Sequence, residues 1–468
     1  MRVNSIFVTA FPLTELGSSL THSLTHSHSQ VKSSQVFNER NMLVNISFIH
    51  MKCFLLVALA ALPAAASVRL ERRAALRVGV GAASAQLGVA SARAASLEGY
   101  DPAGAVTRAE AGRQYFPPLT PPLTNRATYR YELGRDAWAL EQLLVFANVS
   151  ATVRTIVIRL KDGKLWVFSP QWPTGEFCSL LEELGPVGHV VLPCNALEHK
   201  APMGAFTKRY PQASVWVTPG QYGPFGSCGF DAATARMGYR VDGILPAGAF
   251  GPGDPLPPWA DEFDVRTLYV ALPENAGPVA EAAFVHKPSR TLVTVDSVVY
   301  IPSAAPPIFE SYFSAAEVRQ PDFWPKSVLQ AVFLPLRYSA PQADATSGAI
   351  SGVTTGWPGY DAVQGRLLRA PILRAFADAR APTAVREWVG SIGAMCAFDR
   401  IVTAHFASPI RATPSEYVAA FNYLQGPTAD PPIACSDWSL LDGLNELIGA
   451  QKLGAPVVYD FKQGCPPA

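Results

Sequence analysis

The sequence has little charge and no basic region of the kind that binds nucleic acid. Charged residues make up 16% of the 468-residue chain, and the formal net charge is +1. A nucleic-acid-binding domain normally carries a strongly basic face, and an electrostatic membrane anchor carries a long run of Lys and Arg. Neither feature is found, so the sequence predicts no nucleic-acid partner and leaves a small molecule or another protein as the unknown partner.

Cysteine is sparse and is not arranged in pairs. The seven cysteines stand at positions 53, 178, 194, 228, 396, 435 and 465, and none forms a Cys-x-x-Cys pair. Such pairs are typical of zinc ribbons and thioredoxin-type centres, which the spacing therefore disfavours. The six cysteines after position 53 could pair in an oxidising compartment, but their spacing does not decide whether they do.

The mature chain is expected to lack a transmembrane segment. The apolar run Cys53–Leu62 is too short to span a bilayer core of about 30 Å as a helix. It follows Met51 and Lys52 and precedes Ala64-Ala65-Ala66, which is the pattern of a cleavable signal. Residues 1–50 are rich in Ser, Thr and Asn without periodicity, and we expect them to be a disordered or untranslated leader.

A second targeting signal follows the first. Arg72-Arg73 precedes an Ala-, Gly- and Val-rich stretch that ends at Ala92-Arg93-Ala94, which resembles a twin-arginine signal with an A-x-A cleavage site. Tandem leaders resemble those of algal plastid proteins, so residues 51–94 are expected to be a presequence for the plastid, with the thylakoid lumen as the final location. An Ala-rich transit peptide and plain secretion remain open, and Asn148-Val149-Ser150 would be a glycosylation acceptor in a secreted protein.

The rest of the chain reads as one large α/β domain. A Pro-rich linker is expected over residues 95–127, the domain over 128–425, and a C-terminal extension that packs on the domain over 426–468. Short apolar runs alternate with stretches of helical periodicity, which is typical of an α/β sheet. Strands are expected at residues 155–160, 165–169, 189–193, 214–218, 279–286, 291–295 and 400–404. Helices are expected at 177–184, at 203–210 and within 365–395, and residues 303–360 are expected to be loop-rich.

Two local patterns sharpen these boundaries. Asp162-Gly163 stands between two expected strands and predicts a hairpin turn, because glycine accepts a positive φ. Thr413, Pro414 and Glu416 have the spacing of a capping box with proline in the first helical turn, so a helix should begin there.

Polar side chains follow three of the expected strands. Glu198 and His199 follow the strand at 189–193, Asp296 follows 291–295, and His405 follows 400–404. In open α/β sheets, ligands bind at the carboxyl ends of the strands, so these residues are candidate metal ligands. Each also has a structural interpretation: a surface Glu-His pair, a turn-capping aspartate and a hydrogen-bonded core histidine. The two other histidines of the mature chain, His189 and His286, are interpreted as structural.

Four separated blocks of the sequence carry a resemblance to a known family: Val191–Lys200, Pro258–Phe263, His286–Asp296 and Asp399–Ala412. In this order they resemble a family of photosynthetic organisms described as domain of unknown function 4336. That family is thought to resemble the metallo-β-lactamase superfamily, so the resemblance implies an αβ/βα four-layer sandwich.

The superfamily's H-x-H-x-D-H motif is only half preserved. When the motif is aligned on His199, its positions hold Cys194, Ala196, Glu198 and His199, so both leading histidines are missing and Glu replaces Asp. Asp296 matches the superfamily's bridging aspartate and His405 its last histidine. Its middle histidine has no counterpart here.

The resemblance therefore implies that the first metal site of the superfamily is lost and that the second persists. The implied ligands are Glu198, His199, Asp296 and His405, with Cys194, Asn195 and Lys200 near the site. Two imidazoles and two carboxylates suit one Zn, Fe or Mn ion. Such an ion could lower the pKa of bound water toward about 7 and polarise an ester, amide or phosphoester.

Three interpretations of the function stay open. The first is a single-metal hydrolase that uses the four implied ligands. The second is a metal-free binding or assembly module in which the same four side chains form a hydrogen-bonded polar network. The third is thiol chemistry at Cys194, although a cysteine at a strand end is more often a buried, unreactive thiol.

Overall fold

The structure is a computed structural model that describes residues 95–97, 104–113, 126–146, 149–221, 239–271, 278–333, 358–425, 433, 435–438, 441–450 and 456–458. All of these residues belong to one compact unit within His50–Ala468. The two leader segments, 1–50 and 51–94, and Asn148 of the glycosylation acceptor lie outside the described residues. The expected domain boundaries stay predictions.

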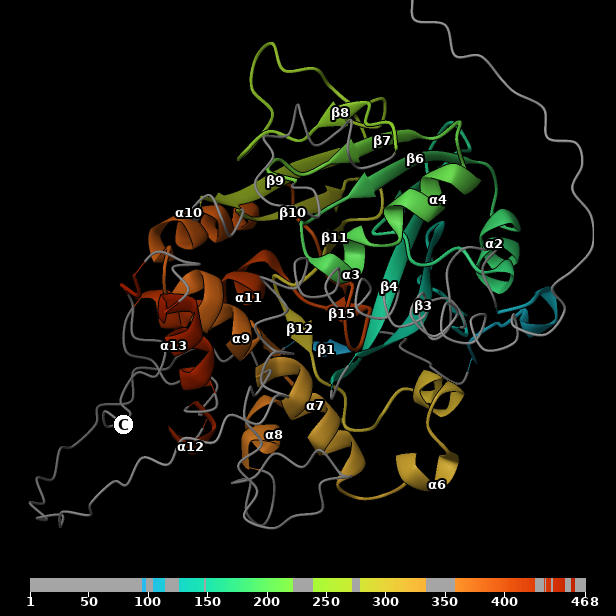
Figure 1. The fold of residues 1–468 in the computed structure, drawn as a ribbon. Coiled ribbons are helices and arrows are strands. Elements are labelled where there is room, and N and C mark those ends of the chain that lie inside the picture. The colour runs from blue at the N-terminus through green and yellow to red at the C-terminus, as the bar shows by residue number, and fades with distance from the viewer. Residues whose placement is uncertain are drawn as a thin grey trace, which may run out of the picture. The chain divides into compact units, whose positions relative to one another are not determined.

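Sheet B contains seven strands and is antiparallel at one end and parallel at the other (Figure 1). Strands β2, β3, β4 and β5 run antiparallel, and β5, β6, β7 and β8 run parallel. Gly163 makes the predicted turn between β4 and β5 with φ +82°. The strands are β2 (Tyr129–Glu132), β3 (Ala137–Phe146), β4 (Val149–Arg159), β5 (Leu165–Phe168), β6 (Val187–Leu192), β7 (Ser214–Val217) and β8 (Gly243–Ile244).

Sheet A contains six strands in the order β1-β15-β14-β11-β10-β9. Only β11 and β14 pair in parallel, and the other neighbours are antiparallel. A separate two-stranded sheet pairs β12 with β13. The strands are β1 (Ser96–Leu97), β9 (Phe263–Val270), β10 (Val279–His286), β11 (Thr291–Thr294), β12 (Val299–Tyr300), β13 (Leu367–Leu368), β14 (Arg400–Thr403) and β15 (Ile410–Arg411).

An aromatic cluster fills the space between the two sheets. Trp166 and Phe168 of β5 pack against Phe284 of β10, and the Trp166 and Phe263 rings stack at 4.4 Å between centroids. All of these side chains are buried in one core cluster with Trp259. Because each aromatic side chain buries a large apolar area, this layer supplies much of the attraction between the sheets.

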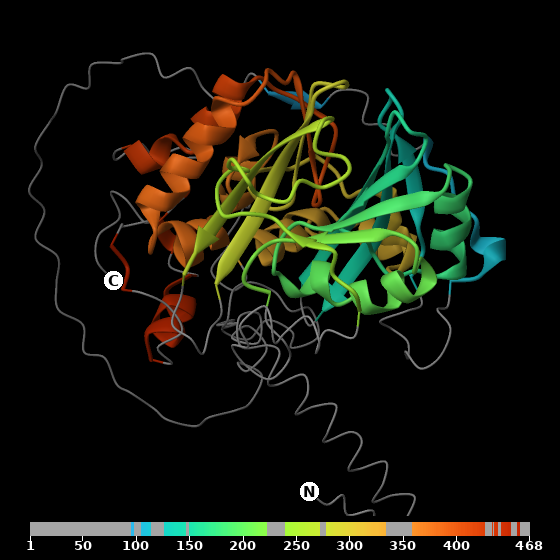
Figure 2. The ribbon, with the colours of Figure 1, turned by 90° about the horizontal axis from the view of Figure 1, so that it is seen from above.

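Helices cover the outer face of each sheet, which gives four layers (Figure 2). On sheet B, α2 (Gly175–Glu182) and α4 (Met203–Arg209) share a core with β4 to β7. On sheet A, α10 (Pro382–Gly393) and α11 (Pro414–Ala419) share a core with β9, β10, β11 and β14. The αβ/βα four-layer sandwich expected from the sequence is thereby confirmed, as is the capping box of Thr413 and Glu416.

A third group of helices packs at the end of the sandwich where β12 and β13 lie. It shares a core with Leu143 and Phe406. The short elements elsewhere are α3 (Leu197–Lys200), η4 (Ala109–Ala111), α9 (Pro371–Leu373), η6 (Arg374–Asp378) and η7 (Asn422–Gln425). The remaining helices are η5 (Pro307–Ser311), α6 (Ala315–Val318), α7 (Phe323–Phe333), α8 (Pro358–Val363), α12 (Cys435–Trp438) and α13 (Asp442–Ala450).

The expectation that residues 303–360 are loop-rich is wrong for α7, and residues 334–357 of that range lie outside the described residues. Pro325 lies in the first turn of this helix, where its missing N–H costs nothing, so proline does not end the helix. Trp324, Val328 and Val332 recur at helical spacing and are buried in the core. The proline content of the segment obscured this periodicity.

Two long strands were not expected from the sequence. β3 carries the consecutive polar residues Glu141 and Gln142, which break the apolar pattern, yet both side chains are fully buried. Pairing with β4 along its whole length keeps this segment a strand. β9 alternates buried and partly buried residues along an edge of sheet A.

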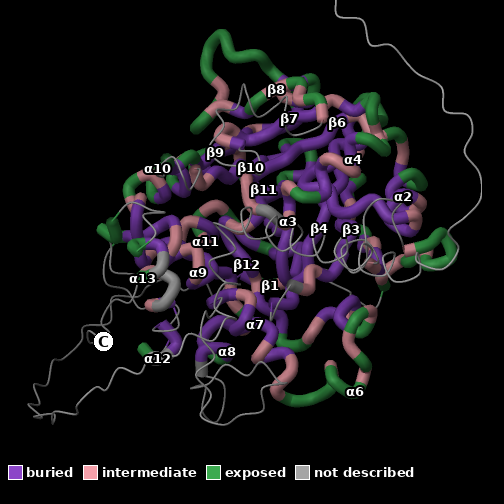
Figure 3. The backbone as a smooth tube through the Cα atoms, in the orientation of Figure 1, coloured by how far each residue is buried: buried purple, intermediate pink, exposed green. Residues whose placement is uncertain are grey.

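Burial is concentrated in the strands, whereas α6 and the turn regions are exposed (Figure 3). In the part of the chain that the structure describes, no helix combines the length and apolar character needed to cross a membrane.

A buried guanidinium ties the two sheets together. Arg154 of β4 pairs with Glu141 of β3 at 2.5 Å, and both side chains are at most 1% exposed. The same guanidinium donates to the carbonyl oxygens of Thr403, at 2.7 Å, and Phe406, which belong to the end of β14 and the following loop. Arg154 thus satisfies a buried carboxylate in sheet B, one carbonyl group of sheet A and one in the loop that follows β14.

Removal of this guanidinium should destabilise the whole domain. We expect Arg154→Met to lower the free energy of unfolding by about 3–5 kcal/mol, because Glu141 is left as an unpaired buried charge. The double variant Glu141→Leu/Arg154→Met should recover part of that loss. Urea unfolding of the full chain measures both values. Arg159→Met, on the same strand but with a side chain 39% exposed, should cost less than about 1 kcal/mol, and an equal cost would contradict the assignment.

Candidate metal centre

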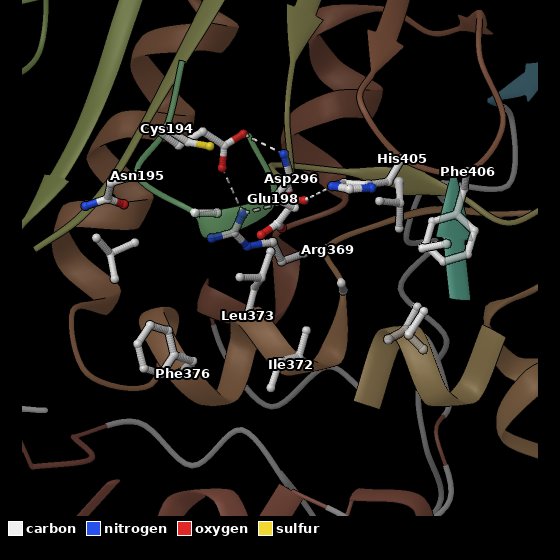
Figure 4. A pocket seen from close by; sticks show the side chains of 18 of the residues that line it. Cys194, Asn195, Glu198, Asp296, Arg369, Ile372, Leu373, Phe376, His405 and Phe406 are labelled. Atoms are coloured by element: carbon white, nitrogen blue, oxygen red, sulfur yellow. Dashed lines mark hydrogen bonds and ion pairs between the residues drawn. The ribbon is translucent and has the colours of Figure 1, made fainter. Parts of the chain in front are cut away.

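The four predicted ligand residues come together at one point. One ligand atom from each of Glu198, His199, Asp296 and His405 lies within 4.8 Å of those of the other three. Figure 4 shows Glu198, Asp296 and His405 around one end of a cavity. The residues come from both sheets: α3 follows β6 of sheet B, whereas Asp296 and His405 follow β11 and β14 of sheet A.

The parallel pairing of β11 and β14 explains why Asp296 and His405 meet. Thr294 pairs with Thr403, so each candidate ligand stands two residues beyond a paired strand end at the same edge of the sheet. His405 Nε2 lies 3.2 Å from Asp296 Oδ1. This is the arrangement expected at the carboxyl ends of parallel strands.

The spacing of the donor atoms fits one ion. Around an ion with ligands at about 2.1 Å, neighbouring donor atoms lie roughly 3.0–3.4 Å apart. The two histidine Nε2 atoms are 3.1 Å apart, and His405 Nε2 is 3.2 Å from Asp296. His199 Nε2 lies 3.9 Å from Glu198 Oε1, so Glu198 is the side chain that would have to shift.

His405 is held in place by sheet B. Its Nδ1 donates to the carbonyl oxygen of Thr152 at 2.7 Å, which directs Nε2 toward the other three residues. The next residue, Phe406, donates its backbone N–H to the Thr152 hydroxyl at 2.8 Å and has a positive φ of 56°. The Phe406 carbonyl accepts from Arg154, so three hydrogen bonds fix this loop.

His199 is held by a hydroxyl that was not predicted. Ser169, the residue after β5, places its Oγ 2.5 Å from His199 Nδ1. Both side chains are fully buried. Ser169 also ends an expected strand, so the same positional rule that selected Asp296 and His405 could have identified it.

The hydroxyl of Ser169 can support either of two tautomers of His199. As an acceptor it leaves the proton on Nδ1, so both Nε2 lone pairs face each other at 3.1 Å and need a cation between them. As a donor it moves the proton to Nε2, which then donates to His405 Nε2 without any ion. The first state suits a metal site and the second a metal-free network.

Burial governs the charge state of the centre. Burial and the nearby Asp296 carboxylate raise the pKa of Glu198 to about 8. Burial, together with His405, lowers the pKa of His199 well below its usual value, so the imidazole is neutral and able to act as a ligand. Burial and the same two carboxylates raise the pKa of the Cys194 thiol well above its usual value.

A third carboxylate, not predicted from the sequence, shapes the Asp296 turn. Glu281 Oε1 accepts the backbone N–H groups of Val295, Asp296 and Ser297 at 2.8–3.2 Å. The backbone of Glu281 also forms an isolated antiparallel bridge with Cys194, which follows β6. This bridge connects sheet A to the end of β6 of sheet B beside the site. Glu281 lies within a strand, where no positional signal marks it as functional.

Arg369 supports the same turn from the opposite direction. It donates to the Asp296 carbonyl at 3.1 Å, and its Nη1 lies 3.7 Å from Glu281. The Asp378 carboxylate accepts hydrogen bonds from Nε and Nη2 of Arg369 and from the Tyr423 hydroxyl. The guanidinium is therefore occupied by protein groups.

The three residues predicted near the site have structural contacts. Cys194 is buried between the sheets, and the Asn195 side chain accepts from the Ala280 N–H at 3.2 Å and donates to the Pro278 carbonyl. Lys200 ends α3 next to His199. His189 and His286 lie elsewhere and contact Ser214 and Ser289 through Nδ1, in agreement with their structural interpretation.

An apolar cavity of about 190 Å³ extends from the centre. Glu198, Asp296 and His405 line one end of it, and Ile372 and Leu373 of α9 and Phe376 line another part (Figure 4). The arrangement places a set of polar ligand atoms at one end of an apolar chamber, which is the usual form of a small-molecule site.

Several solved structures are similar to the chain at low identity. A metallo-β-lactamase from Pontibacter korlensis is 10% identical, with 64% of this chain and 99% of that chain covered and a TM-score of 0.29. The metallo-β-lactamase FIM-1 from Pseudomonas aeruginosa, in its mono-zinc form, is 8% identical, with 64% and 94% covered and a TM-score of 0.30. A fragment of a diflavin flavoprotein from Nostoc sp. PCC 7120 is 12% identical, with 69% and 98% covered and a TM-score of 0.36.

No curated protein matches the chain. A family model described as "Domain of unknown function (DUF4336)" matches residues 135–329 and 354–423, which together make up more than half of the chain. Both matched segments contain residues of the centre: Glu198, His199 and Asp296 in the first and His405 in the second. The chain belongs to this family of domains of unknown function.

Proposed function

We propose that the protein is a hydrolase that uses one divalent metal ion, Zn, Fe or Mn, held by Glu198, His199, Asp296 and His405. The observation that carries this proposal is the convergence of four ligand atoms within 4.8 Å at the end of an apolar cavity. Two imidazoles and two carboxylates are a donor set that suits these ions. A bound ion would supply Lewis acidity and activate water for attack on an ester, amide or phosphoester.

The protein's own groups prepare the centre for this chemistry. Thr152 and Ser169 orient the two imidazoles, and such outer hydrogen bonds normally fix both tautomer and ring direction. Glu281 and Arg369 fix the backbone that carries Asp296. The apolar walls exclude water from the reacting group, which strengthens the electrostatic interactions there.

The metal-free binding or assembly module is the second candidate. The observation that favours it is the hydrogen-bonded chain Ser169–His199–His405–Thr152, which can satisfy every imidazole nitrogen without an ion. A Glu198 pKa of about 8 also allows that carboxyl group to stay neutral beside Asp296 at neutral pH. The two candidates differ in the tautomer of His199.

We also propose that the mature protein resides in an oxidising compartment, with the thylakoid lumen of a plastid favoured over secretion. Cys435 is disulfide-bonded, and disulfides persist in oxidising environments. The predicted second cleavage follows Ala94, and the first described strand, β1, begins two residues later and pairs with β15. N-terminal sequencing of the native protein should therefore find a start at Ala95.

The first prediction of this proposal concerns metal content. The purified full chain should contain about one equivalent of Zn, Fe or Mn by elemental analysis, and His405→Ala should lose it, because one of four ligands is removed. Chelation should lower the unfolding free energy of the unaltered protein, by about 2.7 kcal/mol relative to metal at one hundred times the Kd. His189→Ala removes a histidine outside the centre and should retain the metal. If the purified protein contains no metal and chelator does not change its unfolding free energy, the hydrolase is ruled out.

The second prediction separates the two tautomers. Ser169→Ala should weaken metal binding about 10–100-fold if Ser169 orients His199 as a ligand. Ser214→Ala is the matched control, because its hydroxyl contacts His189 Nδ1 in the same way at 2.8 Å. Competition titration with a fluorescent chelator gives the affinities. If Ser169→Ala lowers stability but leaves metal affinity equal to that of the control, the tautomer assignment is wrong.

The third prediction concerns the thiols. In the folded full chain, Cys194 should resist alkylation and Cys396 should react faster, because Cys194 is buried and its thiol pKa is raised well above the usual value. In the unfolded chain without reductant, both should react, and Cys435 should react only after reduction. Peptide mass spectrometry reads each site. Rapid alkylation of Cys194 in the folded chain would support the hypothesis of thiol chemistry at this residue. Alkylation of Cys435 without reductant would contradict the disulfide.

A further inference from the structure

We propose that the cavity beside the centre binds an uncharged hydrocarbon arm, so that the substrate is a neutral ester or amide with an apolar chain of about six to eight carbon atoms. This inference rests on the proposed hydrolase for the reaction, but the binding of the arm does not depend on a metal. It narrows the substrate from esters, amides and phosphoesters to uncharged acyl compounds.

The walls of the cavity are apolar on several sides. The lining includes Leu144 of β3, Val149 of β4 and Val332 of α7, together with Ile372, Leu373 and Phe376. Because these side chains come from elements of sheet B and from the helices at the end of the sandwich, the chamber is built by the tertiary fold. Apolar walls favour a hydrocarbon group and penalise a polar one that finds no hydrogen bond.

The size of the chamber limits the arm. Its volume is about 190 Å³, and a cavity of about 150 Å³ lined by Leu, Ile and Phe holds one benzene ring. A chain of six to eight carbons is the corresponding size here. A carbonyl at the end of this chain would lie beside Glu198, Asp296 and His405, which form the polar end of the same chamber.

The charges around the chamber disfavour an anionic ligand. Among the described residues that line it, three carry carboxyl groups, Glu198, Glu281 and Asp296, and Arg369 carries the permanent positive charge. Arg369 is only 1% exposed, and its guanidinium already bonds Asp378 and the Asp296 carbonyl. A carboxylate or phosphate would therefore enter a buried acidic region without a hydrogen-bonding cation, which is costly. A cationic arm that lies along the apolar walls would lose its hydration there without a hydrogen-bonding partner, because the carboxyl groups stand at the polar end of the chamber.

Three eight-carbon probes test the inference. The full chain, both as purified and after chelation, is titrated at pH 8 by calorimetry with 2-octanone, with octanoate and with octyl phosphate. We expect 2-octanone to bind at least tenfold more tightly than either anion to the chelated protein, and its affinity to change less than threefold when metal is removed. If either anion binds the chelated protein as tightly as the ketone, the inference is overturned.

Variants locate the binding in this cavity. Ala331 lines the chamber from α7, so Ala331→Phe should fill it and weaken 2-octanone binding at least tenfold. Ala316→Phe makes the same change on the exposed side of α6 and should have no effect. Phe376→Ala should enlarge the chamber and shift the preference from 2-octanone to 2-decanone. If Ala331→Phe fails to fold, as judged by circular dichroism, the Phe376→Ala result decides, and an unchanged chain-length preference overturns the inference.

The outcomes separate this inference from the proposed hydrolase. Binding of 2-octanone by a protein that contains no metal supports the chamber and rejects the hydrolase. A metal-loaded protein that hydrolyses octanoate esters but does not bind 2-octanone, and whose activity is unchanged in Ala331→Phe, supports the hydrolase and rejects the chamber.

Discussion

The guanidinium of Arg154 is the interaction on which the centre depends. It is buried between the sheets, pairs with Glu141 on the neighbouring strand and holds the Thr403 and Phe406 carbonyls of the other sheet. His405 stands between these two carbonyl groups in the chain. Since Thr152, two residues before Arg154 in the sequence, accepts from His405 Nδ1, one short segment of β4 fixes both the approach of the sheets and the direction of this imidazole.

The centre concentrates negative charge in a buried place, and the surrounding structure offsets it. Glu281 accepts hydrogen bonds from three backbone N–H groups and lies near Arg369, which forms an ion pair with Asp378. Glu198 and Asp296 have fewer partners, and burial together with Asp296 raises the pKa of Glu198 to about 8. Two carboxyl groups with few partners beside two imidazoles form a region where a divalent ion would be more favourable than in the rest of the core.

Two residues that precede Glu198 and His199 in the chain pack in the core and take no part in the centre. Cys194 is buried in the aromatic core between the sheets and bridges to Glu281 through the backbone. Ala196 packs against the same core. Neither position offers an imidazole, and the four candidate ligands gather around one point, with the apolar cavity extending from it.

Much of the architecture follows from local sequence, because apolar runs and helical periodicity record which face each element buries. The strands from β4 to β7, β10, β11 and β14 and the helix cap at Thr413 were predictable in this way, and so was the set Glu198, His199, Asp296 and His405, from strand-end position and family resemblance. β3 was not, because its buried Glu141 and Gln142 form their hydrogen bonds with residues on other segments. The contacts that orient the centre were likewise decided by the tertiary structure: Ser169, Thr152, Glu281 and Arg369 act through hydrogen bonds to residues that are 30, 253, 15 and 73 positions away. Side-chain periodicity carries no information about such distant partners, whereas the folded sheets bring them to hydrogen-bonding distance.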